Sequence, residues 1–129
     1  MASRMESKKT VLAVDDSPEN LDVLKGQLTP DYIVKAAING AVALKIASKR
    51  PPDIVLLDVR MPGMDGFEVC QALKQDSTTR DVPVIFVTGE DDAEIRAAAT
   101  KAGVADILSK PVDSNALRET IERCLIGGC

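Results

Sequence analysis

The sequence contains no histidine, and this absence excludes several classes of catalytic and metal site. Zinc fingers, cysteine–histidine nucleophiles and serine–histidine hydrolases all depend on an imidazole, and the chain also lacks a G-x-S-x-G motif. The three cysteines, Cys70, Cys124 and Cys129, are an odd set without C-x-x-C spacing, and the first two are expected to be packing residues. Any chemistry must therefore use carboxylates, hydroxyls or lysine.

Long apolar runs are missing as well. No segment approaches the ~20 residues needed to cross a bilayer, and residues 1–9 form a polar leader without the apolar stretch of a signal peptide. We therefore expect a cytoplasmic protein with no membrane contact. The net charge of −4, from 16 basic and 20 acidic side chains, does not provide the basic surface of a nucleic-acid-binding domain. Direct contact with nucleic acid is not expected.

The residues that are present fit one globular domain. The chain has 129 residues, of which 45% are hydrophobic and 28% charged, so it can form a core without metal or disulfide cross-links. The domain is predicted to span residues 10–126, and residues 127–129 are predicted to be a flexible tail.

Three unbroken apolar runs predict strands that are buried on both faces, as in a parallel sheet. They are Val11–Val14, Ile54–Leu57 and Val84–Val87. Two weaker strands are predicted at Tyr32–Ala36 and Ala105–Leu108. Each short run is compatible with a helix in isolation, but their brevity and their valine and isoleucine content favour strands.

Segments with helical spacing follow each predicted strand. The first begins with Asp16 or Ser17 as N-cap and Pro18 at the first helical position. The others are Ala41–Ser48, a segment marked by Phe67, Cys70 and Leu73, Ala93–Ala102, and a segment marked by Leu117, Ile121, Cys124 and Leu125. The repeated strand–helix order predicts an α/β fold with a doubly wound, five-stranded parallel sheet covered by helices on both faces.

Polar side chains follow four of the five predicted strands. Asp15 and Asp16 follow the first strand, Asp58 the third, Thr88 the fourth and Lys110 the fifth. Ligands of open parallel sheets bind beyond the carboxyl ends of the strands, so these side chains are expected to converge. Three neighbouring carboxylates repel one another unless a cation joins them, and oxygen ligands suit Mg²⁺, with Mn²⁺ as an alternative.

Such a group predicts phosphoryl chemistry, because a carboxylate can be the nucleophile while a metal and a lysine neutralise the transferring group. Each residue also has a plain structural explanation. Asp16 and Ser17 are typical helix caps and Asp58 is typical of a turn, while Thr88 can end a strand and Lys110 can be a solvated loop charge. Their joint occurrence at one edge favours a functional site.

Four motifs resemble the receiver domain of two-component response regulators, which has the chemotaxis-regulator fold. They are VDDS at 14–17, LDVRMPGMDG at 57–66, VTG at 87–89 and SKP at 109–111, and the resemblance covers about residues 9–126. The successive spacings are 42 residues from Asp16 to Asp58, 30 from Asp58 to Thr88 and 22 from Thr88 to Lys110, similar to those of the family. The resemblance implies a flavodoxin-like (βα)5 fold with strand order 2-1-3-4-5.

The resemblance also implies roles for the residues after the first and third strands. Asp58 is implied to be the phosphoacceptor. Asp16 would bind Mg²⁺ directly, together with Asp58 and the main-chain carbonyl of Arg60, and Asp15 would bind it through water. Arg60 and Glu90 occupy positions that tune the lifetime of the acyl phosphate in the family, although solvated surface charges explain both residues equally well.

Further roles are implied for the later motifs. Thr88 and Lys110 would hold phosphoryl oxygens, and a cis bond before Pro111 would aim Lys110 inward. Pro62 and Gly63 would shape the loop after the third strand, where an ordinary type II turn is an equally good explanation.

Regulation in the family couples the threonine to an aromatic residue on the fifth strand. Ile107 stands at that position here and cannot make the aromatic rotamer change, so coupling between Thr88 and Ile107 differs from the family pattern. This departure leaves open an alternative function, a constitutive protein-interaction module, or pseudo-receiver, with a weak response to phosphorylation.

The leading hypothesis is a phosphoacceptor signalling domain that is not a turnover enzyme. Because the chain has no histidine, the phosphoryl donor is a histidine kinase or a phosphotransfer protein in trans. The resemblance implies an output surface on the fourth helix, fifth strand and fifth helix, which would bind a downstream protein or a second copy of the chain. An aspartate-nucleophile phosphatase is the enzymatic alternative, but residues 58–62 lack the second Asp and the Thr of its D-x-D-x-T pattern.

Overall fold

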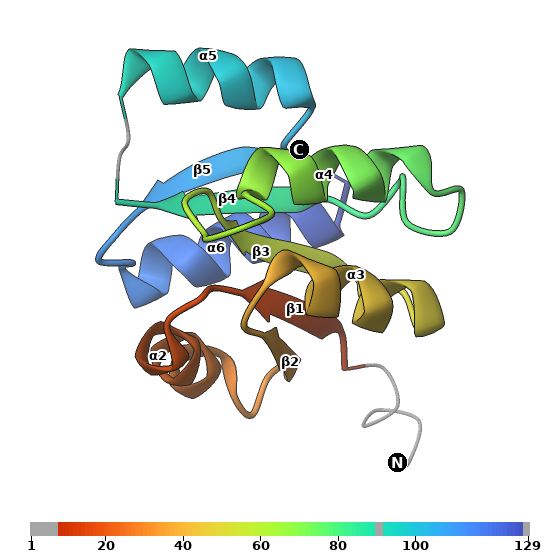
Figure 1. Cartoon of the computed structure of the whole chain (residues 1–129). Helices are drawn as coiled ribbons and strands as arrows, with labels where there is room; N and C mark the ends of the chain where they lie inside the picture. The colour runs from red at the N-terminus through yellow and green to blue at the C-terminus, as the bar shows by residue number, and fades with distance from the viewer. Residues whose placement is uncertain (1–7, 90–91, 128–129) are drawn as a thin grey trace.

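A computed structural model of the chain describes residues 8–89 and 92–127 and shows five strands that alternate with five helices (Figure 1). The strands are β1 (Thr10–Val14), β2 (Ile33–Ala37), β3 (Ile54–Asp58), β4 (Val84–Thr88) and β5 (Asp106–Ser109). The helices are α2 (Pro18–Leu28), α3 (Gly40–Lys49), α4 (Gly66–Gln75), α5 (Ala93–Ala102) and α6 (Ser114–Leu125). Every predicted strand and helix is present, and each predicted boundary lies within one residue of the observed one.

The strands form one parallel sheet in the order β2-β1-β3-β4-β5, which confirms the predicted topology. β3 and β4 are buried at every position, as their unbroken apolar sequences require. β2 and β5 lie at the two edges and are more exposed. All carboxyl ends of the strands point to the same side, on the left of Figure 1.

Helices cover both faces of the sheet and enclose two apolar cores (Figure 1). On one face, α3, α4 and α5 pack against alternate strand residues such as Leu57 and Phe86. On the other face, α2 and α6 pack against the intervening residues, such as Leu56 and Ile85. This alternation follows from the period of two in a strand, so each central strand contributes to both cores. Among the described residues, no helix has the length and apolar character needed to cross a membrane.

Local signals explain where the helices begin and end. Ser17 is the N-cap of α2 and accepts a hydrogen bond from the backbone N–H of Asn20, which resolves the choice between Asp16 and Ser17. Asp65 and Glu68 form a reciprocal capping box at the start of α4. α5 ends as predicted, at Gly103, whose φ of 82° is in the left-handed region.

Candidate functional site

The predicted carboxylates meet at the carboxyl edge of the sheet. Asp15 and Asp16 follow β1, and Asp58 is the last residue of β3, which pairs directly with β1. Each of the three side chains offers a carboxylate oxygen, and these oxygens all lie within 4.8 Å of one another. Asp15 and Asp58 are only 2% and 5% exposed, whereas Asp16 faces solvent. The acid cluster therefore has two buried members and one open side.

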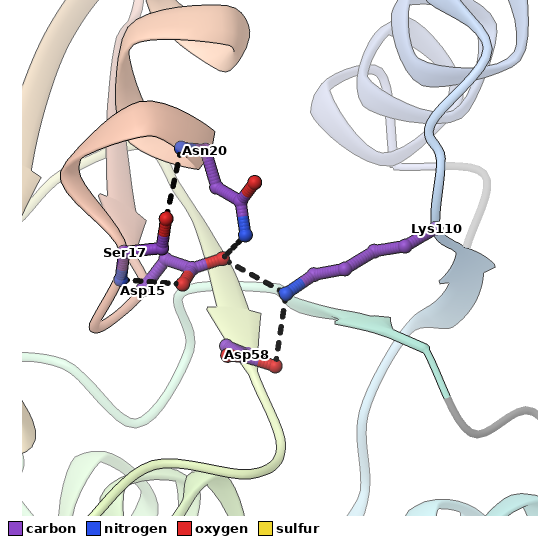
Figure 2. Close-up of polar contacts among 5 residues, drawn as sticks. All are labelled: Asp15, Ser17, Asn20, Asp58 and Lys110. Carbon is purple, nitrogen blue, oxygen red and sulfur yellow. Dashed lines mark hydrogen bonds and ion pairs between the residues drawn. The ribbon is translucent and has the colours of Figure 1, made fainter.

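Hydrogen bonds hold the Asp15 carboxylate in one orientation (Figure 2). Its Oδ1 accepts from the backbone N–H of Ser17 at 2.9 Å, at the start of α2. Its Oδ2 accepts from the Nδ2 of Asn20 at 3.2 Å and from the Nζ of Lys110 at 3.0 Å. Because donors reach both oxygens from α2 and from the end of β5, Asp15 ties the first helix to the last strand of the sheet.

Lys110 extends between two carboxylates of the cluster (Figure 2). Its Nζ lies 3.0 Å from Asp15 Oδ2 and 3.4 Å from Asp58 Oδ1. Burial is the largest single effect on this ammonium and lowers its pKa, but the hydrogen bond to Asp15 and the charges of both carboxylates outweigh it, so the pKa of Lys110 is raised. The lysine is thus held as a cation that partly neutralises the two buried acids.

The pKa of the Asp58 carboxyl is raised above its usual value. Burial is the main cause, and the negative charge of Asp15 adds to it. Lys110 and a hydrogen bond from the backbone N–H of Arg60 oppose this shift only in part. Excess negative charge therefore remains at a site built from three carboxylates with an open side, and this donor set fits a divalent cation such as Mg²⁺ that keeps some of its waters.

The structure places the two predicted switch residues differently with respect to the acid cluster. Thr88 ends β4, is 1% exposed, and accepts a hydrogen bond at its main-chain oxygen from the Lys110 N–H at 2.9 Å. Ile107 pairs with Phe86 across β4 and β5, and its side chain packs, partly buried, against the core under α3, α4 and α5. Thr88 therefore contacts the segment that carries Lys110 through its main chain, whereas Ile107 belongs to the layer beneath α5.

The remaining predicted residues lie in the loops that border the cluster. Pro62 and Gly63 are exposed in the loop between β3 and α4, and Gly63 has the positive φ of 76° that a type II turn requires. Pro111 follows Lys110 through a cis peptide bond, as the resemblance implied. Arg60 is exposed, two residues after the end of β3. Glu90, its expected partner in tuning the acyl phosphate, lies outside the described residues.

Two residues near the site were not assigned roles from the sequence. Asn20, in the first turn of α2, donates a hydrogen bond to Asp15. The sequence signal that could have identified it is an amide side chain five residues after Asp15, at the start of a helix. Gly66 begins α4, and a Cβ on it would lie 2.5 Å from the main-chain oxygen of Asp58 and 2.8 Å from the Cα of Val59. The glycine therefore permits α4 to start against the strand that carries Asp58.

Known proteins share both the sequence and the fold. Response regulator PleD of Caulobacter vibrioides is 46% identical over 104 residues, which is 80% of this chain but only 23% of the length of PleD. Protein PilH of Pseudomonas aeruginosa is 37% identical over 118 residues, covering 91% of this chain and 98% of PilH. The chain thus spans under a quarter of one relative and nearly all of the other.

The fold is also shared with a solved structure. The chemotaxis protein CheY4 of Vibrio cholerae superimposes with a TM-score of 0.86 at 32% identity, covering 91% of this chain and 98% of that one. Phosphorylation and Mg²⁺ binding are features of the family to which these proteins belong. The model of the response regulator receiver domain matches residues 11–122, and the chain accordingly belongs to the receiver-domain family of two-component systems.

Proposed function

We propose that this domain accepts a phosphoryl group on Asp58 and acts as a signalling switch. The observation that carries the proposal is the pairing of a nearly buried carboxylate with a lysine cation, 3.4 Å away, at the edge where Asp15 and Asp16 add two further carboxylates. An Asp58 oxygen would attack the phosphorus of a donor phosphohistidine, forming an acyl phosphate as the bond from phosphorus to the imidazole nitrogen breaks.

A divalent cation would be held by Asp16 and Asp58, with Asp15 acting through water and the main-chain carbonyl of Arg60 as a further ligand. When bound, Mg²⁺ would neutralise negative charge on the phosphoryl group during transfer. Lys110 and the hydroxyl of Thr88 would hold the phosphoryl oxygens. Lys110 already has the charge and the reach for this role, because its Nζ contacts both buried carboxylates.

The phosphoryl donor in this proposal is a histidine kinase or a phosphotransfer protein, since the chain has no histidine of its own. The output surface would be α5, β5 and α6, of which β5 is an edge strand of the sheet (Figure 1). A downstream protein or a second copy of the chain would bind there. The domain would assist its own phosphorylation and dephosphorylation without turning over a separate substrate.

The direct test is to incubate the protein with acetyl phosphate and Mg²⁺ and to measure its intact mass. We expect one labile phosphoryl adduct, which is absent from Asp58→Asn and is lost when EDTA replaces Mg²⁺. An adduct on Asp58→Asn in the same yield would refute Asp58 as the acceptor. No adduct on the wild-type protein, under conditions in which Mg²⁺ binds, would refute the phosphoacceptor function.

Ile107 favours a second candidate function, a protein-interaction module with little response to phosphorylation. The residue is packed beneath α5, and it lacks the ring that could exchange between an inner and an outer position. Hydrogen exchange of α5, β5 and α6, measured with and without the phosphoryl group, distinguishes the two functions. Changed protection of these elements supports the switch, and identical protection supports the constitutive module.

A further inference from the structure

Two hydrogen bonds hold the main chain of the segment that carries Lys110, one at Lys110 and one at Val112. On one side, the Lys110 N–H donates to the main-chain oxygen of Thr88 at 2.9 Å. On the other side, the Nε2 of Gln27 donates to the main-chain oxygen of Val112 at 3.2 Å. Gln27 lies in the last turn of α2 and is separated from Val112 by 85 residues in the sequence, so this hydrogen bond joins two distant parts of the chain.

The side-chain amide of Gln27 has a partner for its N–H but none for its oxygen. The Oε1 of Gln27 is buried and, in the part of the chain that the structure describes, has no hydrogen-bond partner. A buried acceptor without a partner destabilises a fold, and a methionine of similar length would avoid it. The amide cannot simply be reversed, because its Oε1 would then face the carbonyl oxygen of Val112. The hydrogen bond to the main-chain oxygen of Val112 is therefore the contact that distinguishes Gln27 from a methionine at this position.

Other contacts make α2 a fixed support for this bond. At its first turn, Asn20 and the backbone N–H of Ser17 hold the Asp15 carboxylate. At its last turn, the main-chain oxygen of Gln27 accepts a hydrogen bond from Arg118 of α6, which also pairs with Asp31. One helix thus holds the acid that Lys110 contacts and, at its other end, the chain two residues after Lys110.

We propose that Gln27 is a positioning residue for Lys110. By fixing the carbonyl of Val112 it sets the path of the segment after β5, and with it the point from which the Lys110 side chain reaches Asp15 and Asp58. The inference rests on the proposed function, in which Lys110 holds a phosphoryl oxygen. Placement matters because small errors in the position of a catalytic group reduce rates strongly.

The first test compares the rate of Asp58 phosphorylation by acetyl phosphate in the wild type and in Gln27→Met. We expect the rate at saturating Mg²⁺ to fall roughly three- to tenfold. The thermal unfolding temperature should stay near that of the wild type, because removal of the buried unpaired oxygen offsets loss of the hydrogen bond to Val112. If Gln27→Met does not fold, Gln27→Asn takes its place in this test. Asparagine keeps the amide on a shorter side chain that does not reach Val112, so it should slow the reaction similarly. Lys25→Met is the matched control, since it places the same methionine at an exposed position in the last turn of the same helix, and its rate should equal that of the wild type.

A double-mutant cycle tests whether Gln27 acts through Lys110. In a Lys110→Ala background the Gln27→Met change should have little further effect on the rate, because the group that it positions is absent. A wild-type rate for Gln27→Met, or an equal loss in both backgrounds, would overturn this inference alone. A wild-type protein that forms no adduct on Asp58 would overturn the proposed function and this inference with it.

Discussion

Asp58 is ionised at a cost to the folded state, because burial and the charge of Asp15 raise its pKa. Where a folded-state pKa lies above the unfolded value, ionisation weakens the fold as the pH rises through the two values, and the loss persists at neutral pH. The same two causes, a desolvated acid beside a second acid, attract a divalent cation. The charges at the metal-free site therefore lower the stability of the fold and, for the same reason, favour binding of a divalent cation.

Removing this charge should stabilise the metal-free protein. In EDTA at pH 7 we expect Asp58→Asn to raise the free energy of unfolding by on the order of 1 kcal/mol, as measured by urea denaturation. The difference should shrink as the pH falls through the raised folded-state pKa toward the usual value near 4, and it should be absent at lower pH, where the wild-type carboxyl is protonated in both states. A variant that is less stable than the wild type at pH 7 would contradict the direction of the Asp58 pKa shift.

Cys70 should be chemically inert in the folded protein. Its side chain is fully buried, its Sγ lies 3.7 Å from the main-chain oxygen of Ala102, and burial raises the pKa of its thiol despite the opposing charge of Lys74. The reactive thiolate is therefore scarce and inaccessible. Peptide mapping after iodoacetamide treatment at pH 7.5 should find Cys70 unmodified in the native protein and modified in urea. Rapid labelling under native conditions would show that α4 opens readily.

At the scale of elements, the contact of α4 with β3 depends on a glycine at its start. A Cβ at Gly66 would lie 2.5 Å from a backbone oxygen, so the helix and the strand must separate to admit it. A Cβ at Gly26 of α2 would meet nothing within 4 Å. The two positions therefore form a matched pair in which the same substitution has opposite effects.

We expect Gly66→Ala to lower the free energy of unfolding by about 1–3 kcal/mol and to weaken Mg²⁺ binding, because the displaced backbone carries Asp58. Gly26→Ala should raise that free energy by roughly 0.5–1 kcal/mol and leave Mg²⁺ binding unchanged. Urea denaturation and isothermal titration with Mg²⁺ measure the two effects. Equal stability of the two variants would show that α4 accommodates the methyl group without moving.

The sequence was sufficient to predict the elements whose burial is complete. β3 and β4 are buried on both faces, so their apolar runs left little ambiguity. The edge strands were harder: β2 is half exposed and begins one residue later than expected, at Ile33, and β5 has no fully buried residue. Local signals set the helix boundaries well, as at Gly103, because caps act through neighbouring residues.

The acid cluster was also predictable, since the order of strands and helices brings all carboxyl ends to one edge. Asn20 and Gln27 were not, for a different physical reason. Each acts on a group that only the packing of α2 brings near, and no local pattern marks a hydrogen bond from Gln27 to a carbonyl 85 residues away. The roles of Arg60 and Ile107 remain predictions, because they concern the phosphorylated state.

At the scale of the molecule, the acid cluster proposed to bind metal forms only in the folded chain. Asp16 and Asp58 are 42 residues apart in sequence and meet because β1 pairs with β3. A ligand that binds only the folded state stabilises it by mass action. Binding of Mg²⁺ should therefore be measurable as stability of the whole domain.

We expect the thermal unfolding temperature of the wild type to rise progressively with MgCl₂ at constant ionic strength. Asp16→Asn should remove most of this rise, and because Asp16 is exposed its metal-free unfolding temperature should remain near that of the wild type. Differential scanning calorimetry with and without EDTA gives both values. An undiminished Mg²⁺ effect in Asp16→Asn would contradict its role as a direct ligand.

The edge strand β5 lies between helices of opposite layers, with α5 on one face of the sheet and α6 on the other. A protein bound along this edge touches both layers at once, and the chain from β5 leads directly to Lys110. Thermodynamic linkage then works in both directions: a partner that prefers the phosphorylated form shifts the phosphorylation equilibrium by the same free energy that phosphorylation adds to its binding. A target of this surface would therefore act on the signal as well as receive it.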